Sequence, residues 1–232
     1  MKLIPNAAVV FDVDGPLLNL GPAEEQAFFT PFKTLFGIEG LSNNWDSYRI
    51  RNDRDIIHEI LEDYLGDRFE PHHYHTLLDE YDRELTAGFA EGRLQVTPIP
   101  GALELLQTLS ASGSLTLGMA TANIRRAAEI RLRQASMWDY VRDHPGAADE
   151  GGHKHEVLAR VITTMGLPSK RVVYIGDNLN DLEAGQINGV HFIGFHVNEA
   201  RRQRLLDHGA GHVSGNHDET LWLINRILGL ET

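Results

Sequence analysis

The sequence predicts an α/β protein: a Rossmann-like parallel sheet with helices on both faces, and a small all-α segment inserted after the first strand. A continuous apolar run at 7–13, rich in β-branched residues, is typical of a strand buried on both faces. Helical patterns without a convincing strand follow from about 18 to 95. After 97, strands and helices alternate, which favours a parallel sheet. We therefore expect a core of residues 1–17 and 96–232, interrupted by a helical segment of residues 18–95.

The inserted segment begins with a helix over 21–37. Pro22 lies near its start, two glutamates occupy its first turn, and Gly37 ends it. Pro31 is expected to kink or split this helix, because proline lacks the N–H group that a helix interior needs. Two further helical patterns, 53–66 and 74–89, complete the segment.

The core then continues with strands and helices in alternation. Strands are predicted at 115–121, 171–176, 191–197 and 212–215. Helices are predicted at 102–109, 124–136, 155–166 and 218–228, with shorter ones near 182–187 and 200–204. In a sheet of this kind, ligands bind beyond the carboxyl ends of the strands, so the residues that follow each strand are the candidates for function.

The composition excludes several classes of protein. The chain has 232 residues and a formal net charge of −12, which argues against nucleic acid or an anionic membrane as its main partner. No apolar stretch is long enough to cross a bilayer, and the opening residues predict a first strand rather than a signal peptide. The absence of cysteine excludes disulfides and thiolate catalysis, and it favours a cytoplasmic location.

Acidic side chains follow two of the predicted strands. Carboxylates that meet at one sheet edge repel each other unless a cation lies between them, and their hard oxygen atoms suit Mg²⁺. A hydroxyl and an ammonium group nearby suit the remaining oxygens of a bound phosphate. The pattern therefore predicts a site for magnesium and phosphate. The candidate residues are Asp12, Asp14, Thr121, Asn123, Lys154, Asp177 and Asp181.

These residues stand in short motifs whose order is informative. "FDVDG" at 11–15, Thr121, Lys154 and "GDNLND" at 176–181 resemble, in that order, the haloacid dehalogenase (HAD) superfamily of phosphohydrolases. The stretch "IPGALELLQTLSASG" and the helical segment also resemble the phosphoglycolate phosphatase and β-phosphoglucomutase branch. The resemblance spans nearly the whole chain. It implies a HAD-like core and a helical cap formed by residues 18–95.

The resemblance also implies a role for each motif residue. Asp12 is the nucleophile that forms an aspartyl-phosphate, and Asp14 protonates the leaving oxygen and then activates water. Thr121 and Lys154 hold the phosphoryl oxygens. Mg²⁺ is bound by Asp12, the carbonyl of Asp14 and Asp177, with Asp181 supporting that shell. The implied reaction is Mg²⁺-dependent hydrolysis of a small phosphorylated metabolite.

Two positions depart from the usual pattern of that family. Pro16 stands where Thr or Val is common, and His155 follows Lys154 where proline is usual. The fixed φ of proline suits the first residue of a helical turn, so Pro16 is compatible with activity. We further expect Mg²⁺ and Lys154 to keep Asp12 ionised, while Asp14, farther from both, holds a proton for the leaving group.

Several interpretations stay open at this stage. Asn123 either contacts phosphate or caps the following helix. Arg49 and Arg51 either meet an anionic leaving group or are solvated loop residues, and the basic stretch 200–204 is interpreted as a solvated helix face. The alternative activities are a phosphomutase of the β-phosphoglucomutase type and a non-catalytic HAD-like binding module. We expect a monomer or a homodimer.

Overall fold

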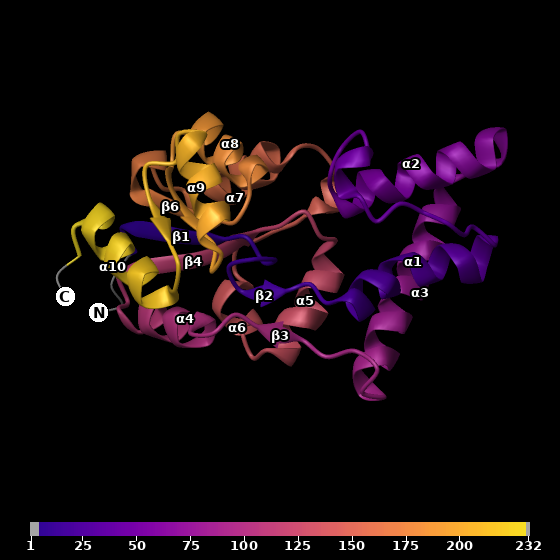
Figure 1. Cartoon of the computed structure of the whole chain (residues 1–232), viewed down its shortest axis with the longest axis horizontal. Helices are drawn as coiled ribbons and strands as arrows, with labels where there is room; N and C mark the ends of the chain where they lie inside the picture. The colour runs from indigo at the N-terminus through magenta and orange to yellow at the C-terminus, as the bar shows by residue number, and fades with distance from the viewer. Residues whose placement is uncertain (1–4, 231–232) are drawn as a thin grey trace.

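The computed structural model describes residues 5–230, and it has two parts joined by closely spaced chain segments (Figure 1). The ends of the predicted core range, 1–4 and 231–232, lie outside the described residues. The part that contains the sheet lies at the end of the molecule where both termini are found, and the helices of the inserted segment lie at the other end. None of the helices within residues 5–230 is long and apolar enough to cross a membrane.

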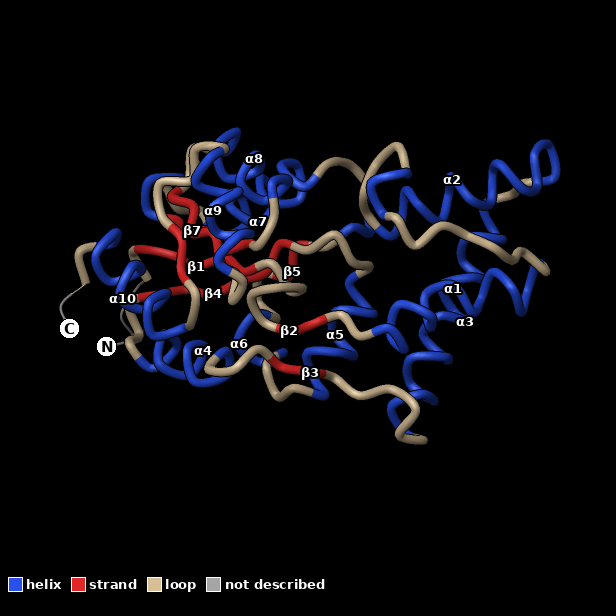
Figure 2. The backbone as a smooth tube through the Cα atoms, viewed as in Figure 1, coloured by secondary structure: helices blue, strands red, loops and turns tan. Residues whose placement is uncertain are grey.

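A parallel sheet forms the centre of the first part (Figure 2). Within residues 5–230 it has six strands in the order β5-β4-β1-β6-β7-β8. The register places Phe11 of β1 opposite Met119 of β4 and Ile175 of β6, so these three strands end at the same edge. The predicted parallel sheet is therefore confirmed. The strands are β1 (Ala7–Phe11), β4 (Leu115–Ala120), β5 (Pro145–Gly146), β6 (Val172–Gly176), β7 (His191–Phe195) and β8 (Val213–Ser214).

Helices cover both faces of this sheet, because the side chains of β1 alternate between two hydrophobic clusters. Val9 and Phe11 pack with α4 (Ala102–Ala111), α6 (Trp138–Val141) and α10 (His217–Leu228) on one face. Ala8 and Val10 pack with the helices of the other face. Those helices are α7 (Lys154–Met165), α8 (Leu179–Asn188) and α9 (Glu199–Asp207).

The inserted segment has a hydrophobic cluster of its own. Its helices are α1 (Pro22–Phe36), α2 (Asp53–Leu65) and α3 (Pro71–Ala90). Phe32 and Leu77 lie at the centre of this cluster and are fully buried. Pro31 was predicted to kink or split the first helix, and the split is wrong, because α1 runs unbroken through Pro31. Proline removes one backbone hydrogen bond there, and the burial of Pro31 and Phe32 keeps the helix in place.

Two short strands join the inserted segment to the sheet-containing part. β2 (Leu18–Asn19) pairs antiparallel with β3 (Thr97–Pro98), so the chain leaves and returns side by side. The sequence predicted no strand between 18 and 95, and β2 corrects this. A two-residue strand has no readable periodicity, and its partner lies almost 80 residues away along the chain.

Helix α5 (Arg125–Gln134) lies between the two parts and contacts both clusters. Ala128 and Leu132 pack against the sheet side, while Ala127 and Ile130 pack against the inserted helices. Arg131, which lies between Ile130 and Leu132, is also buried. The same helix therefore supports both walls of the space between the two parts.

Candidate active site

Three of the predicted site residues lie at one edge of the sheet because three adjacent strands end there. Asp12 follows β1, Thr121 follows β4 and Asp177 follows β6. The turn after β1 passes close to Asp177. A Cβ atom on Gly15, whose φ is +101°, would lie 2.5 Å from Cγ of Asp177. Glycine at this position lets the two strand ends approach each other.

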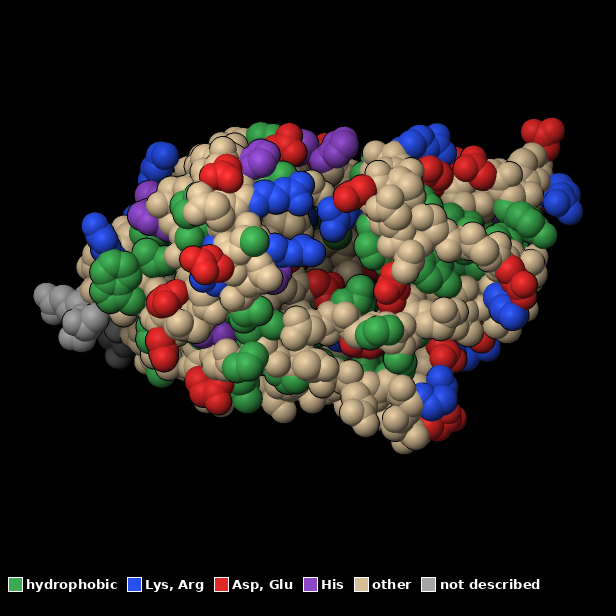
Figure 3. Space-filling model, viewed as in Figure 1, with side chains coloured by type: hydrophobic (Ala, Val, Ile, Leu, Met, Phe, Trp, Pro, Cys, Tyr) green, Lys and Arg blue, Asp and Glu red, His purple; other side chains and the backbone are tan. Residues whose placement is uncertain are grey.

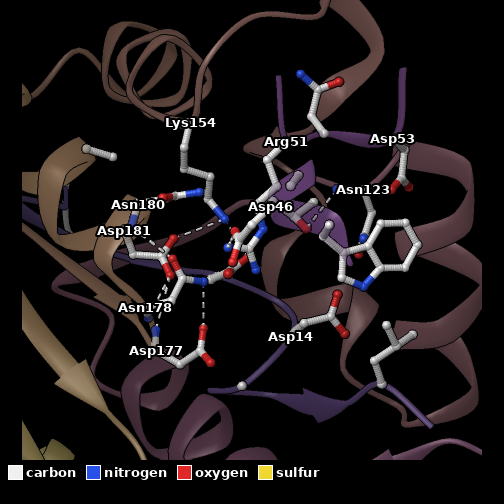
Figure 4. Close-up of a pocket in the computed structure, with 18 of the residues that line it drawn as sticks. Asp14, Asp46, Arg51, Asp53, Asn123, Lys154, Asp177, Asn178, Asn180 and Asp181 are labelled. Atoms are coloured by element: carbon white, nitrogen blue, oxygen red, sulfur yellow. Dashed lines mark hydrogen bonds and ion pairs between the residues drawn. The ribbon is translucent and has the colours of Figure 1, made fainter. Parts of the chain in front are cut away.

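Lys154 connects the acidic residues of this edge (Figure 4). It is the first residue of α7, and its Nζ lies 2.8 Å from Oδ1 of Asp12 and 3.1 Å from Oδ1 of Asp181. Oδ1 of Asp12 also accepts a hydrogen bond of 2.7 Å from the backbone N–H of Val13. The side chains of Lys154 and Asp12 are only 10% and 7% exposed, so this ion pair is shielded from water.

Asp181 is held by hydrogen bonds on both of its oxygens. Oδ1 accepts from the hydroxyl of Tyr174 at 2.6 Å as well as from Lys154. Oδ2 accepts from the backbone N–H groups of Asp177 and Asn178, at 3.1 and 3.3 Å. The Asn178 side chain in turn caps α8. Since both Asp181 oxygens are engaged, this carboxylate is suited to orienting its neighbours.

The carboxylates of Asp12, Asp177 and Asp181 lie close enough to share a metal ion, with one oxygen of each within 4.8 Å of the others. Burial raises the pKa of Asp12 well above its ordinary value, although Lys154 lowers it. Burial, followed by the Asp181 charge, raises the pKa of Asp177 to about 7. One lysine therefore does not neutralise these acids, and their hard oxygen donors fit Mg²⁺.

The side chain of Asp14 lies apart from those of Asp177 and Asp181 (Figure 4), and the sequence did not predict its partner. Both of its oxygens accept hydrogen bonds from the guanidinium of Arg131, at 2.5 and 3.2 Å. The sequence predicts that Asp14 lies farther from Mg²⁺ and Lys154 than Asp12 does and holds a proton, but it gives no indication of the contact with Arg131. Burial alone lowers the pKa of Arg131, but Asp14 and Glu24 raise it above its ordinary value, so the arginine is charged.

Thr121 and Asn123 both line the cavity. Thr121 is 1% exposed, and its hydroxyl accepts a hydrogen bond of 3.2 Å from the backbone N–H of Asn123. The alternative that Asn123 caps the following helix is wrong, because its side-chain oxygen accepts from Arg131 instead. The first N–H groups of α5 are bound by acids from elsewhere in the chain: Ile124 donates to Asp53, and Arg125 donates to Asp149.

The start of α2 docks on the loops that carry Thr121 and Lys154. Asp53 donates its backbone N–H to the carbonyl of Ala122 at 2.9 Å, and its side chain accepts from Ile124 at 2.9 Å. Asn52 donates to the carbonyl of Gly152 at 2.8 Å, and the N–H of Gly152 donates to Asp55. These contacts bring the inserted segment over the strand ends.

The two parts enclose a cavity of about 910 Å³, and all seven candidate residues of the predicted magnesium and phosphate site line it. Figure 3 shows it as a hollow between the parts, with basic side chains gathered at its rim. Arg49 and Arg51 both line it, and each lies beside an acid: Arg49 is 3.3 Å from Glu59, and Arg51 is 2.9 Å from Asp46. Arg201, which is exposed on α9 as the sequence predicted, also lines the cavity.

Comparisons with known proteins agree with the predicted family. Residues 9–195 match the family model described as haloacid dehalogenase-like hydrolase. A comparison with curated proteins gives no significant sequence match.

Several solved structures share the fold of this chain. CbbY from Rhodobacter sphaeroides, solved with phosphate, is 20% identical over 91% of this chain and 94% of its own, with a TM-score of 0.69. A putative β-phosphoglucomutase from Bacteroides vulgatus is 17% identical over 99% and 91%, with a TM-score of 0.67. A predicted phosphoglycolate phosphatase from Haemophilus somnus is 13% identical over 96% and 98%, with a TM-score of 0.67. At these identities the likeness establishes the fold.

Proposed function

The chain belongs to the haloacid dehalogenase-like hydrolase family, and we propose that it is a Mg²⁺-dependent phosphatase that hydrolyses a small phosphorylated metabolite through an aspartyl-phosphate. One observation carries the proposal. Oδ1 of Asp12 is held by Lys154 and by Val13 N–H, and no residue from 5 to 230 donates a hydrogen bond to Oδ2. The Asp12 carboxylate is thus fixed through Oδ1, and Oδ2 is available to attack phosphorus in line.

In the first step, Oδ2 of Asp12 forms a bond to phosphorus while the bond from phosphorus to the leaving oxygen breaks. Asp14 supplies the proton that this leaving oxygen takes up. Lys154, and the Thr121 hydroxyl beside the strand end, offer hydrogen bonds to the phosphoryl oxygens. Asn123 lines the same wall and is proposed as a further phosphate contact.

In the second step, a water oxygen bonds to phosphorus and the bond between phosphorus and Asp12 breaks. Asp14 takes the proton of that water, which restores the enzyme. Asp12, Asp177 and the Asp14 carbonyl, supported by Asp181, would hold Mg²⁺, and the bound ion would neutralise charge on the phosphoryl oxygens.

We propose that the inserted helices, residues 18–95, form a cap that supplies substrate contacts. The hydrogen bonds that Asn52 and Asp53 make with the site loops support this, because they dock α2 over the strand ends. Arg49 and Arg51 are then placed to meet an anionic leaving group. Around an acidic protein, basic side chains at the cavity rim favour entry of a phosphorylated molecule.

Release of phosphate from p-nitrophenyl phosphate, measured with Mg²⁺ and after its removal with EDTA, tests the proposal. We expect turnover with Mg²⁺, loss with EDTA and recovery on re-addition. Ca²⁺ should inhibit, because its larger and looser coordination shell misplaces the nucleophile. Phosphate release by the Asp12→Asn variant at the wild-type rate would reject the mechanism.

A phosphomutase is the second candidate, because one solved neighbour carries that name in putative form and covers nearly the whole chain. A mutase returns the phosphoryl group to a sugar hydroxyl instead of to water. Incubation with a sugar phosphate in ¹⁸O-labelled water separates the two, since hydrolysis puts the label into phosphate and a mutase yields an unlabelled sugar phosphate isomer.

A further inference from the structure

The buried residue Arg131 joins polar side chains from three separate segments of the chain. It is the largest of the fully buried side chains among residues 5–230. Its Nε donates to Glu24 at 2.8 Å, and its Nη1 donates to the Asn123 side chain at 3.2 Å. The remaining donors form the two-pronged contact with Asp14. All three of its nitrogens are therefore directed at polar groups of the cavity wall.

We propose that Arg131 is a positioning residue for Asp14, and that it makes the orientation of Asp14 depend on the docking of α1 through Glu24. The inference rests on the proposed phosphatase function, in which Asp14 handles the protons. The planar guanidinium matches both carboxylate oxygens, which fixes the rotation of the Asp14 side chain as a single charge does not.

Glu24 is the part of this network that belongs to the inserted segment. It is 2% exposed and lies in the first turn of α1. One of its oxygens accepts from Arg131, and the other accepts from the backbone N–H of Gly21 at 3.1 Å, at the start of the helix. Any movement of α1 away from α5 therefore breaks the contact with Arg131 or turns the guanidinium.

Stability alone does not account for this arrangement. Buried ion pairs are replaced by apolar side chains of similar size with little loss, and sometimes with a gain, in stability. Arg131 is flanked in α5 by apolar residues that pack into both clusters. Apolar residues in place of both Arg131 and Glu24 would suit the two clusters, whereas the arginine contacts Asp14, which is 117 positions away along the chain and lines the cavity.

The consequence for the reaction is specific to proton transfer. Phosphorylation of Asp12 by an alkyl phosphate needs Asp14 aimed at the leaving oxygen, but p-nitrophenolate leaves with little protonation. Loss of the Arg131 contact should therefore slow the first step on a poor leaving group and spare it on a good one. General damage to the site would slow both.

The experiment measures leaving-group release before the steady state, for Arg131→Lys and Arg131→Met, with p-nitrophenyl phosphate and glycerol phosphate. The matched control is Arg133→Met, which removes an exposed arginine of the same helix that pairs with Glu129. We expect Arg131→Met to slow the first step about 100-fold on glycerol phosphate and less than about 3-fold on p-nitrophenyl phosphate. Arg131→Lys should show the same selectivity with a smaller loss.

Two further variants keep the test decisive if Arg131→Met does not fold. Glu24→Gln retains an acceptor for Arg131 and should cost a few-fold on glycerol phosphate alone. In an Asp14→Asn background, Arg131→Lys should cost less than about 2-fold further, because it acts through Asp14. Equal losses on both substrates, or full additivity with Asp14→Asn, overturn this inference alone. A wild-type protein that releases no phosphate from either ester overturns the proposed function with it.

Discussion

The two walls of the cavity are built differently. The wall that holds Asp12 is made by the sheet and its own helices, with Lys154, Asp177 and Asp181 all contributed by elements after the inserted segment. The wall that holds Asp14 depends on Arg131, whose other carboxylate partner is Glu24 of α1. The first wall is fixed by strand order. The second includes Glu24 of the inserted helices. In the proposed mechanism, the nucleophile Asp12 is therefore held by the core alone, whereas the orientation of the proton carrier Asp14 depends on docking.

The largest effect on activity should come from a substitution of Asp12 in the first wall. Asp12→Asn removes the attacking oxygen and the charge that pairs with Lys154, and should lower kcat on p-nitrophenyl phosphate by about 10⁴-fold or more. Steady-state phosphate release measures this. The control is Asp143→Asn, whose side chain is 87% exposed and should leave the rate unchanged. A rate within 10-fold of wild type would show that another group attacks phosphorus.

Asp177→Asn should act on the same wall through the metal. We expect kcat to fall about 100-fold, with a rise in the Mg²⁺ concentration needed for half-maximal rate. The pKa of Asp177 is raised to about 7 by burial, so protons compete with Mg²⁺ below that pH. In the wild type, Mg²⁺ affinity should fall as pH drops from 8 to 6. The dependence should be weaker in the variant but not absent, because the pKa of Asp12 in the same cluster is also raised by burial. Mg²⁺ titration at several pH values checks the assignment, and an unchanged titration contradicts it.

Arg49→Ala and Arg51→Ala should have smaller effects, because both residues belong to the inserted segment and lie at the rim. We expect KM for a metabolite with an anionic leaving group to rise about 10-fold, with little change for p-nitrophenyl phosphate. Arg68→Ala, an exposed arginine of the same segment outside the cavity, is the control. Equal losses on both substrates would remove the two residues from a role in specificity.

The smallest effect is expected at the docking contact of α2. Burial raises the pKa of Asp53 to about 7 from an ordinary value of 3.8. The folded protein therefore loses stability as pH rises from about 4 to 7, where the unfolded chain has already released the proton. Asp53→Asn keeps an acceptor for Ile124 N–H and removes this cost.

The Tm of Asp53→Asn should thus equal that of wild type near pH 4 and exceed it by about 5 °C above pH 7. Thermal unfolding followed by circular dichroism across this range measures the difference. Asp63→Asn, an exposed change in the same helix, should show no pH-dependent gain. A difference that shrinks as pH rises would contradict the sign of the effect.

The same comparison explains how much the sequence could predict. The first wall was predictable because the end of a buried strand can be recognised in the sequence, and parallel strands bring their ends together. The positions of Asp12, Thr121 and Asp177 could therefore be predicted without knowledge of side-chain packing. Arg131 was not predictable in this way. It lies in the middle of the basic stretch "IRRAAEIRLRQ", where nothing local separates it from the exposed Arg133.

The inserted segment shows the same limit. Its helices were predicted from periodicity, but the docking contacts of Asn52 and Asp53 join residues 70 or more positions apart. Asp53 was read as part of a helix start, and the structure shows that it also binds the N–H of Ile124. The sequence around an acidic residue at the start of one helix does not show that its carboxylate accepts a hydrogen bond at the start of a second helix.

Trapping the phosphorylated enzyme tests the division between the two walls most directly. The Asp14→Asn variant is mixed with p-nitrophenyl phosphate, quenched in acid, digested and analysed by mass spectrometry. The account predicts a burst of p-nitrophenolate and a phosphoryl group on Asp12, because the first step needs little proton donation while the second needs Asp14 to activate water. A variant that is slowed without a burst, and whose Asp12 peptide carries no phosphoryl group, would contradict it.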